Sequence, residues 1–320
     1  MRALFILLCA VCLGGCSVMP KGTERVFYQT SSPRWLGDAD IRLAKTEKGV
    51  GYLSYPEEVR SQYPAVIILH TSLGVGGLEK EFMHKLNEAG IATLIVDSFT
   101  LRGLHKIVDD QTAVSEASIL ADLFSAHTYL KTQNKIDPTN IGVVGFSKGA
   151  LPALYSSFTS IYARYGYDND PFRSHLSFYP WCGLELKSWA MGSPVQIHSG
   201  GHDVITPASL CAALSDKVKR QNPASPITFF EYEGQRHAFT HPKLGALKLP
   251  VSYPYPAHCR IIEQENGSFV EQSSGRIIDA DNLSDIINGC SIKGAWVSGD
   301  KAARMRAYQR AMVFIQNSFE

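Results

Sequence analysis

A serine with glycines two residues away on either side is the strongest chemical signal in the chain. The segment Gly145 to Gly149 reads Gly-Phe-Ser-Lys-Gly and follows an apolar run. Between a buried strand and a helix, this pattern is typical of a nucleophile elbow, a sharp turn that exposes the serine hydroxyl. The pattern therefore predicts Ser147 as a nucleophile. It lacks the lysine-serine order of a Walker loop and the three-glycine spacing of a dinucleotide-binding loop.

A general base and an acid that orients it follow Ser147 in the chain. Serine is a weak nucleophile at neutral pH and needs both groups. Asp203 follows a predicted strand that ends at His198, and His237 follows one that ends near Glu233. The order Ser, Asp, His is that of the α/β-hydrolase fold. The sequence therefore predicts a catalytic triad of Ser147, Asp203 and His237.

Other titratable residues are weaker candidates. His241 is an alternative base, but it lies further from the strand end than His237. Asp97 also ends a predicted strand, yet it precedes the serine, which is the wrong order for the acid of this fold. His198 and His202 have the spacing of a helical metal site, but two glycines between them indicate a loop. We expect no metal ion and no cofactor.

Strands and helices alternate through most of the chain. Apolar, β-branched runs such as Ala65 to Leu69 indicate strands that are buried on both faces. The alternation predicts an α/β fold with a mainly parallel central sheet and helices on both faces. The expected strands are 50–55, 65–69, 91–96, 141–146, 175–179, 194–198 and 227–232, and the expected helices are 78–89, 112–132, 207–220 and 301–317.

The stretch from about 241 to 299 breaks this alternation. It contains Pro250, Pro254 and Pro256 and shows no sustained hydrophobic period. We interpret it as an irregular insertion that either caps the site or faces a partner. The helix expected at 301–317 then closes the domain against the sheet.

The first residues resemble a bacterial lipoprotein signal. Arg2 precedes an apolar run, Ala3 to Leu13, that is too short to span a bilayer. The next residues resemble a lipobox, which predicts that Cys16 is lipidated; plain secretion is the alternative. We expect a lipid-anchored protein of the bacterial cell envelope, on the outer-membrane or periplasmic side. The expected divisions are a signal peptide (1–15), an anchor and linker (16–45) and a hydrolase domain (46–320).

Four cysteines lie beyond Cys16, and export permits disulfides between them. Four cysteines allow three pairings. Cys259 with Cys290 is favoured because both lie in the insertion. Cys182 with Cys211 is the second candidate pair, with two separate buried thiols as the alternative. No two of these four cysteines have the Cys-x-x-Cys spacing, which argues against a metal site.

Charge and composition exclude several classes of partner. The chain has 31 basic and 30 acidic residues, interspersed along its length, for a formal net charge of +1. Without a polybasic stripe, nucleic acid is not an expected partner. Its 320 residues, 45% of them hydrophobic, suit one large domain with an insertion.

Three segments together resemble the dienelactone hydrolase family. They are the elbow at Ser147, the stretch Gly201 to Pro207 around Asp203, and the run from His237 to Phe239. The resemblance covers roughly residues 63–239 and implies an α/β-hydrolase that cleaves a carboxylic ester or a related acyl bond in a small molecule. The namesake enzymes of the family use a cysteine nucleophile. Because Ser147 stands here instead, lactone specificity is not carried over.

Backbone N–H groups are expected to stabilise the oxyanion of the reaction. In this fold one donor follows the nucleophile, at Lys148, and another lies in the loop after His70, at Ser72 or Leu73. Arg102 is a candidate for binding a substrate carboxylate, with a structural salt bridge as the alternative. The expected function is a serine hydrolase with an acyl-enzyme intermediate. The alternatives are a peptidase, an acyltransferase or a non-catalytic envelope binding lipoprotein.

Overall fold

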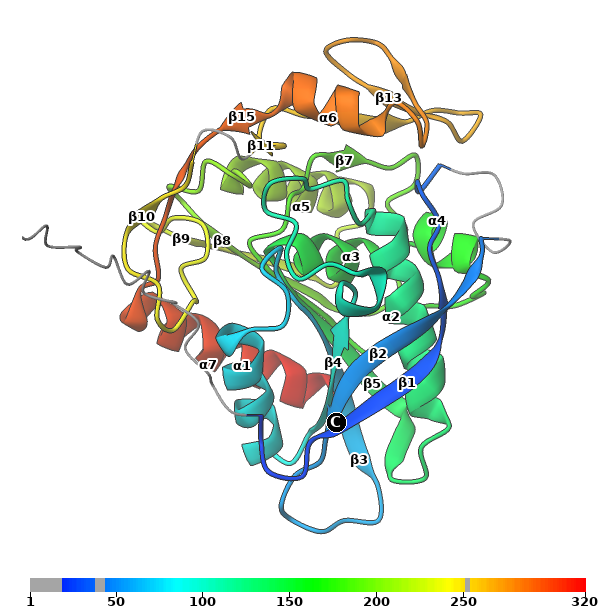
Figure 1. The fold of residues 1–320 in the computed structure, drawn as a ribbon, viewed down its shortest axis with the longest axis vertical. Helices are drawn as coiled ribbons and strands as arrows, with labels where there is room; N and C mark the ends of the chain where they lie inside the picture. The colour runs from blue at the N-terminus through cyan, green and yellow to red at the C-terminus, as the bar shows by residue number, and fades with distance from the viewer. Residues whose placement is uncertain (1–18, 38–43, 251–253) are drawn as a thin grey trace, which may run out of the picture.

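The computed structural model describes residues 19–37, 44–250 and 254–320. Its centre is an eight-stranded sheet of order β1-β2-β4-β3-β5-β6-β8-β9 (Figure 1). The strands are β1 (Glu24–Ser31), β2 (Thr46–Ser54), β3 (Tyr63–Leu69), β4 (Ala92–Asp97), β5 (Ile136–Phe146), β6 (His175–Phe178), β8 (Val195–Gly200) and β9 (Ile227–Tyr232). All neighbours from β4 to β9 pair in parallel, while β2 pairs antiparallel with both β1 and β4. The predicted mainly parallel sheet is confirmed.

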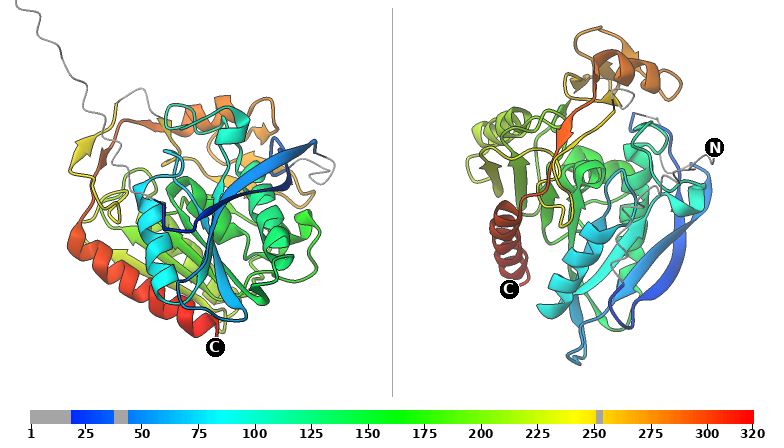
Figure 2. Two further views of the ribbon diagram at one scale, coloured as in Figure 1. Left: turned by 60° about the horizontal axis from the view of Figure 1, so that its bottom comes forward. Right: turned by 60° about the vertical axis from the view of Figure 1, so that its left-hand side comes forward.

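Helices cover both faces of this sheet. On one face α1 (Gly77–Glu88) and α7 (Lys301–Ser318) share an apolar cluster, in which the rings of Phe82 and Tyr308 lie 5.0 Å apart. On the other face α2 (Glu116–Lys131), α3 (Ala150–Tyr155) and α5 (Ala208–Gln221) form a second cluster. The short helix α4 (Thr159–Tyr162) follows α3. Figure 2, left, shows α1 and α7 separated from α2 by the sheet.

The predicted insertion has regular structure, which corrects the expectation of an irregular segment. It lies beyond one end of the central sheet (Figure 1) and is built from ladders of two or three residues, which are too short to give a hydrophobic period. Its helix is α6 (Leu283–Cys290). The paired strands are β10 (Leu247–Lys248) with β16 (Trp296–Val297), β11 (Pro254–Tyr255) with β15 (Ile292–Lys293), and a sheet of β14 (Ile277–Ile278), β13 (Phe269–Glu271) and β12 (Ile261–Glu263). In this sheet β12 also pairs with β7 (Leu184–Glu185), which lies outside the insertion.

Two further expectations about boundaries differ from the structure. Residues 24–31, predicted to belong to a linker, form the edge strand β1 of the central sheet. The helix expected from residue 112 begins at Glu116, because Ser115 caps it by accepting a hydrogen bond from the Ser118 N–H. The predicted signal peptide and Cys16 lie outside the described residues. No helix in the described part of the chain is both long and apolar enough to cross a membrane.

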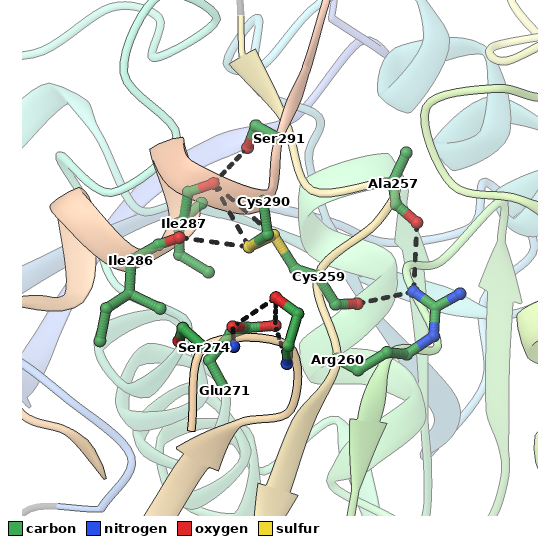
Figure 3. Close-up of a disulfide and its surroundings, with 10 residues drawn as sticks. Ala257, Cys259, Arg260, Glu271, Ser274, Ile286, Ile287, Cys290 and Ser291 are labelled. Carbon is green, nitrogen blue, oxygen red and sulfur yellow. Dashed lines mark hydrogen bonds between the residues drawn. A yellow bond between two sulfur atoms is a disulfide. The ribbon is translucent and has the colours of Figure 1, made fainter. Parts of the chain in front are cut away.

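Two disulfides stabilise the region around the insertion. Cys259 is bonded to Cys290 at the end of α6 (Figure 3), so the favoured pairing is present. Cys182, which follows β6, is bonded to Cys211 on α5, so the second candidate pair is present as well. The first disulfide closes the insertion on itself. The second fixes the segment after β6 to a helix of the main domain.

Candidate active site

The elbow at Ser147 has the strained geometry that the glycine pattern predicts. β5 ends at Phe146, and Ser147 begins a single 3₁₀ turn that leads into α3. The backbone φ of Ser147 is 52°, in the left-handed region that costs a non-glycine residue free energy. A Cβ atom at Gly145 would lie 2.1 Å from the carbonyl oxygen of Gly149, and one at Gly149 would lie 2.6 Å from that of Leu69. Both glycines are therefore required by close backbone contacts.

The structure brings the three residues of the predicted triad together. His237 lies in the loop after β9, and its Nε2 is 2.7 Å from the Ser147 Oγ. Its Nδ1 is 2.7 Å from the Asp203 Oδ2. The side chains of His237 and Asp203 are 7% and 0% exposed, so water competes little for these hydrogen bonds. Because Nδ1 donates to the carboxylate, Nε2 is left to accept the serine proton.

Asp203 is held by neighbours from its own loop, which follows β8. Its Oδ1 accepts hydrogen bonds from the N–H groups of Ile205 and Thr206, at 2.8 and 2.9 Å. The Thr206 hydroxyl donates to Oδ2 at 2.9 Å. The ring of Tyr179 packs edge-on against the imidazole of His237, with ring centroids 4.9 Å apart. These contacts fix the carboxylate and the imidazole in the orientation that the triad requires.

Two N–H groups next to Ser147 are free to bind an oxyanion. Among the described residues, neither the Ser72 N–H nor the Lys148 N–H has a hydrogen-bond acceptor. The Leu73 N–H instead donates to the Thr71 Oγ1 at 3.1 Å. Of the two positions that the sequence left open, the structure therefore favours Ser72 over Leu73.

His70 orients the peptide group that carries the Ser72 N–H. The His70 Nε2 accepts a hydrogen bond from the Ser98 N–H at 3.1 Å, so Nδ1 carries the ring proton and donates to the Thr71 carbonyl at 2.7 Å. The Thr71 carbonyl and the Ser72 N–H belong to one planar peptide unit. Sequence reasoning missed this role, and its only signal is a histidine directly after a buried strand.

Arg102 does not take part in the site, which corrects its assignment as a substrate-binding residue. Its guanidinium makes two hydrogen bonds to the carboxylate of Asp122, at 2.7 and 3.0 Å, and one to the Ser98 carbonyl. It is not among the residues that line the cavity at Ser147. Arg102 therefore forms a structural salt bridge, the alternative considered from the sequence. A guanidinium group that is bonded to a buried carboxylate is not available to a ligand.

The other histidines considered from the sequence are not placed for catalysis. His241 lines the cavity, but its Nδ1 accepts a hydrogen bond from the Lys243 N–H, and burial lowers its pKa. His198 is fully buried between the side chains of Gln196 and Tyr232, and burial lowers its pKa to about 3. His202 is exposed. In the described part of the chain no group of three or more His, Cys, Asp or Glu side chains is arranged to hold a metal ion.

A cavity of about 230 Å³ opens above Ser147 and His237. Most of its wall is apolar, and both the main domain and the insertion contribute. The main domain supplies Leu73, Leu78, Val108, Leu151, Trp181, Ile205 and Ala238, and the insertion supplies Leu244, Leu247, Leu249, Tyr255, Pro256 and Val297. The insertion therefore caps the site, one of the two roles considered for it.

Comparison with known proteins identifies the family. A model of the dienelactone hydrolase family matches residues 50–271. A Bradyrhizobium sp. protein named as a probable 2-oxo-3-(5-oxofuran-2-ylidene)propanoate lactonase is 23% identical over 201 residues, which are 60% of this chain and 79% of that protein. An uncharacterised protein of Mycobacterium tuberculosis is 27% identical over 191 residues, which are 54% of this chain and 64% of that protein.

Solved structures agree with this fold. A dienelactone hydrolase-like promiscuous phosphotriesterase from metagenomic libraries superposes with a TM-score of 0.54 at 14% identity, over 92% of this chain and 99% of that chain. Because the family model matches more than half of its residues, the chain belongs to the dienelactone hydrolase family and is a hydrolase.

Proposed function

We propose that the protein hydrolyses carboxylic esters through an acyl-enzyme formed on Ser147. One observation carries the proposal, the hydrogen-bonded series from the Ser147 Oγ through His237 to Asp203, with both distances at 2.7 Å. A serine in this series has an adjacent base, and the base has an orienting carboxylate. The backbone strain at Ser147 places the hydroxyl at the mouth of the elbow, where the cavity begins.

Acylation follows from this geometry. The Ser147 Oγ attacks the ester carbonyl while its proton passes to the His237 Nε2, and Asp203 stabilises the imidazolium that forms. The negative charge on the carbonyl oxygen is bound by the N–H groups of Ser72 and Lys148. Collapse of the tetrahedral intermediate breaks the ester bond, and His237 returns the proton to the leaving alcohol.

Deacylation repeats these steps with water as the nucleophile. His237 removes a proton from water, the hydroxide attacks the acyl carbonyl, and the same two N–H groups bind the oxyanion. The carboxylic acid leaves and Ser147 recovers its proton from His237. No group other than the triad and the two N–H donors is needed for either half of the reaction.

The test is active-site labelling of the purified domain with a fluorophosphonate probe. We expect the wild-type protein to be labelled and Ser147→Ala to be unlabelled, because only an activated serine reacts with the probe. Ser98→Ala is the control, since Ser98 directly follows β4 and lies outside the triad. An unlabelled wild-type domain with a normal unfolding transition would refute the proposed function, as would labelling that persists in Ser147→Ala.

We further propose that the mature chain is anchored to the bacterial envelope through a lipid on Cys16. The support is the lipobox-like sequence and its preceding short apolar run. Mass spectrometry of the mature N-terminus measures the modification directly. We expect a lipid-modified cysteine there and, in Cys16→Ala, release of the domain from the membrane fraction. An unmodified N-terminus on a soluble, exported domain would indicate plain secretion instead.

A further inference from the structure

The cavity wall contributed by the insertion is attached to the catalytic loop. Val297 forms a parallel bridge with His237, and the Ser298 N–H donates to the His237 carbonyl at 3.2 Å. Val297 also pairs with Leu247 in the β10–β16 ladder, and both side chains line the cavity. This wall is therefore in a fixed position relative to the imidazole. Its shape and polarity act directly on any group bound next to Ser147.

Among the described residues, the cavity offers no unpaired cation to a substrate. Lys148 is the only lysine or arginine among the described residues that line it. Its side chain is 5% exposed, and its Nζ donates to the Gln111 carbonyl at 2.7 Å and forms an ion pair with Glu116. Burial lowers the pKa of His241 and so disfavours its charged form. A carboxylate bound here would lose its hydration without gaining a partner, and it would lie near the Glu116 carboxylate.

The size of the cavity limits the apolar group that it accepts. A dry cavity of about 150 Å³ binds benzene, so by proportion a cavity of about 230 Å³ holds a group of about nine carbon atoms. A second cavity of about 50 Å³ adjoins the first, and the two share the lining residues Gln111, Glu116, Leu151, Trp181 and Pro256. Trp181 has the largest side chain of these five residues, so it forms a large part of the boundary between the two cavities.

We propose that the site selects uncharged esters with an apolar group of up to about nine carbon atoms and rejects esters that carry a carboxylate on that group. The inference rests on the proposed ester hydrolysis at Ser147 and names its substrate class. The apolar wall supplies the binding free energy, in proportion to the apolar surface that the ligand buries. The Lys148–Glu116 pair supplies the discrimination against anions.

Two esters of equal chain length test the charge selectivity. 4-Nitrophenyl pentanoate ends in a methyl group, and the 4-nitrophenyl monoester of glutaric acid ends in a carboxylate at the same carbon. We expect kcat/KM to be about a hundredfold higher for the pentanoate, because the carboxylate must be buried without a partner. A preference of less than about threefold, or a preference for the glutarate, would overturn the inference.

A matched pair of variants tests the role of the ion pair. Glu116→Gln removes the carboxylate and leaves the ammonium group of Lys148 without its counter-ion, so we expect the ratio of glutarate to pentanoate kcat/KM to rise about tenfold. Glu263→Gln is the control, because Glu263 pairs with Arg164 and does not line the cavity. We expect its ratio to equal that of the wild type. An unchanged ratio in Glu116→Gln, or an equal change in both variants, would contradict this role of the pair.

Fluorophosphonate labelling of the same samples separates this inference from the proposed function. Labelling at Ser147 without a preference for the neutral ester would overturn the substrate class and leave the serine hydrolase standing. Labelling without turnover of either ester would also overturn the substrate class, because the pentanoate fits the cavity. A folded protein that is not labelled would overturn the proposed function itself.

Discussion

Replacing His70 with phenylalanine separates orientation of the oxyanion donor from the chemistry of the triad. The new ring has a similar shape and keeps an edge contact with Phe99, whose ring centroid lies 4.3 Å from that of His70. It removes the hydrogen bond from Nδ1 to the Thr71 carbonyl and the acceptor of the Ser98 N–H. The peptide unit that carries the Ser72 N–H then loses the bond that orients it.

The loss of kcat in His70→Phe is at most the loss expected when one oxyanion donor is removed. Complete loss of such a donor costs about 3 kcal/mol of transition-state stabilisation, or about a hundredfold in rate. Because the peptide unit is displaced rather than removed, we expect kcat for an ester substrate of His70→Phe to fall between about tenfold and a hundredfold. KM should change little, because the oxyanion forms only in the transition state. The orphaned Ser98 N–H should also lower the free energy of unfolding by about 1–3 kcal/mol.

Steady-state kinetics and urea unfolding measure these two effects separately. His127→Phe is the matched control, because His127 is a buried histidine on α2, with its ring 5.1 Å from that of Phe172. It lies about 16 Å along the helix from Glu116, from the rise of 1.5 Å per residue. We expect this control to change stability but to leave kcat within about twofold of the wild type. A normal kcat in His70→Phe, or an equal loss in both variants, would refute the role assigned to His70.

Three further predictions concern the cavity, the insertion and the buried His198. Trp181→Ala should join the two adjoining cavities. In a series of 4-nitrophenyl esters, kcat/KM should then peak at a longer acyl chain than in the wild type. An unchanged profile would contradict the role of Trp181 as a boundary between the cavities. Replacing Cys259 and Cys290 together by alanine should lower the free energy of unfolding by about 3–4 kcal/mol, because the disulfide closes a loop of 31 residues; calorimetry measures this, and an unchanged transition would contradict it. Burial lowers the pKa of His198 to about 3, so below pH 6.5 the unfolded chain binds more protons than the folded one. The free energy of unfolding should therefore decrease by about 3 kcal/mol as the pH is lowered from 6.5 to 4. Urea unfolding at several pH values should show a smaller decrease in His198→Phe, and an equally steep one would contradict the assignment.

The strands of the main sheet were predictable because the local sequence of each one indicates its conformation. The run from Ile227 to Tyr232 coincides with β9, since a short apolar segment between turn residues leaves few other conformations. The start of α2 was missed by four residues, because the cap at Ser115 lacks the glutamate or glutamine that marks a capping box. The triad residues were found by their order along the chain and their places after strand ends, which are both sequence properties.

The wall of the cavity was not predictable for the opposite reason. The bridge between Val297 and His237 joins residues far apart in the chain and depends on tertiary pairing, which leaves no local pattern. Likewise, the ion pair that occupies Lys148 comes from Glu116, at the start of another helix. From the sequence alone, Lys148 is a cation beside the nucleophile. Only its burial against Glu116 shows that this charge is already neutralised.

Only some of the residues that line the cavity lie within the segment that matches the family. The family match ends at residue 271, whereas Val297 lines the cavity and bridges the loop of His237. The triad can therefore be shared with relatives while the group bound beside it differs. A lactone substrate named for a relative does not transfer to this chain, because part of the wall beside Ser147 lies outside the family match. The test is to exchange the β10–β16 ladder of this chain with the corresponding segment of a relative. Substrate preference that moves with the ladder, while Ser147 is still labelled, would support this division between shared chemistry and separate specificity. Substrate preference that stays with the main domain would refute it.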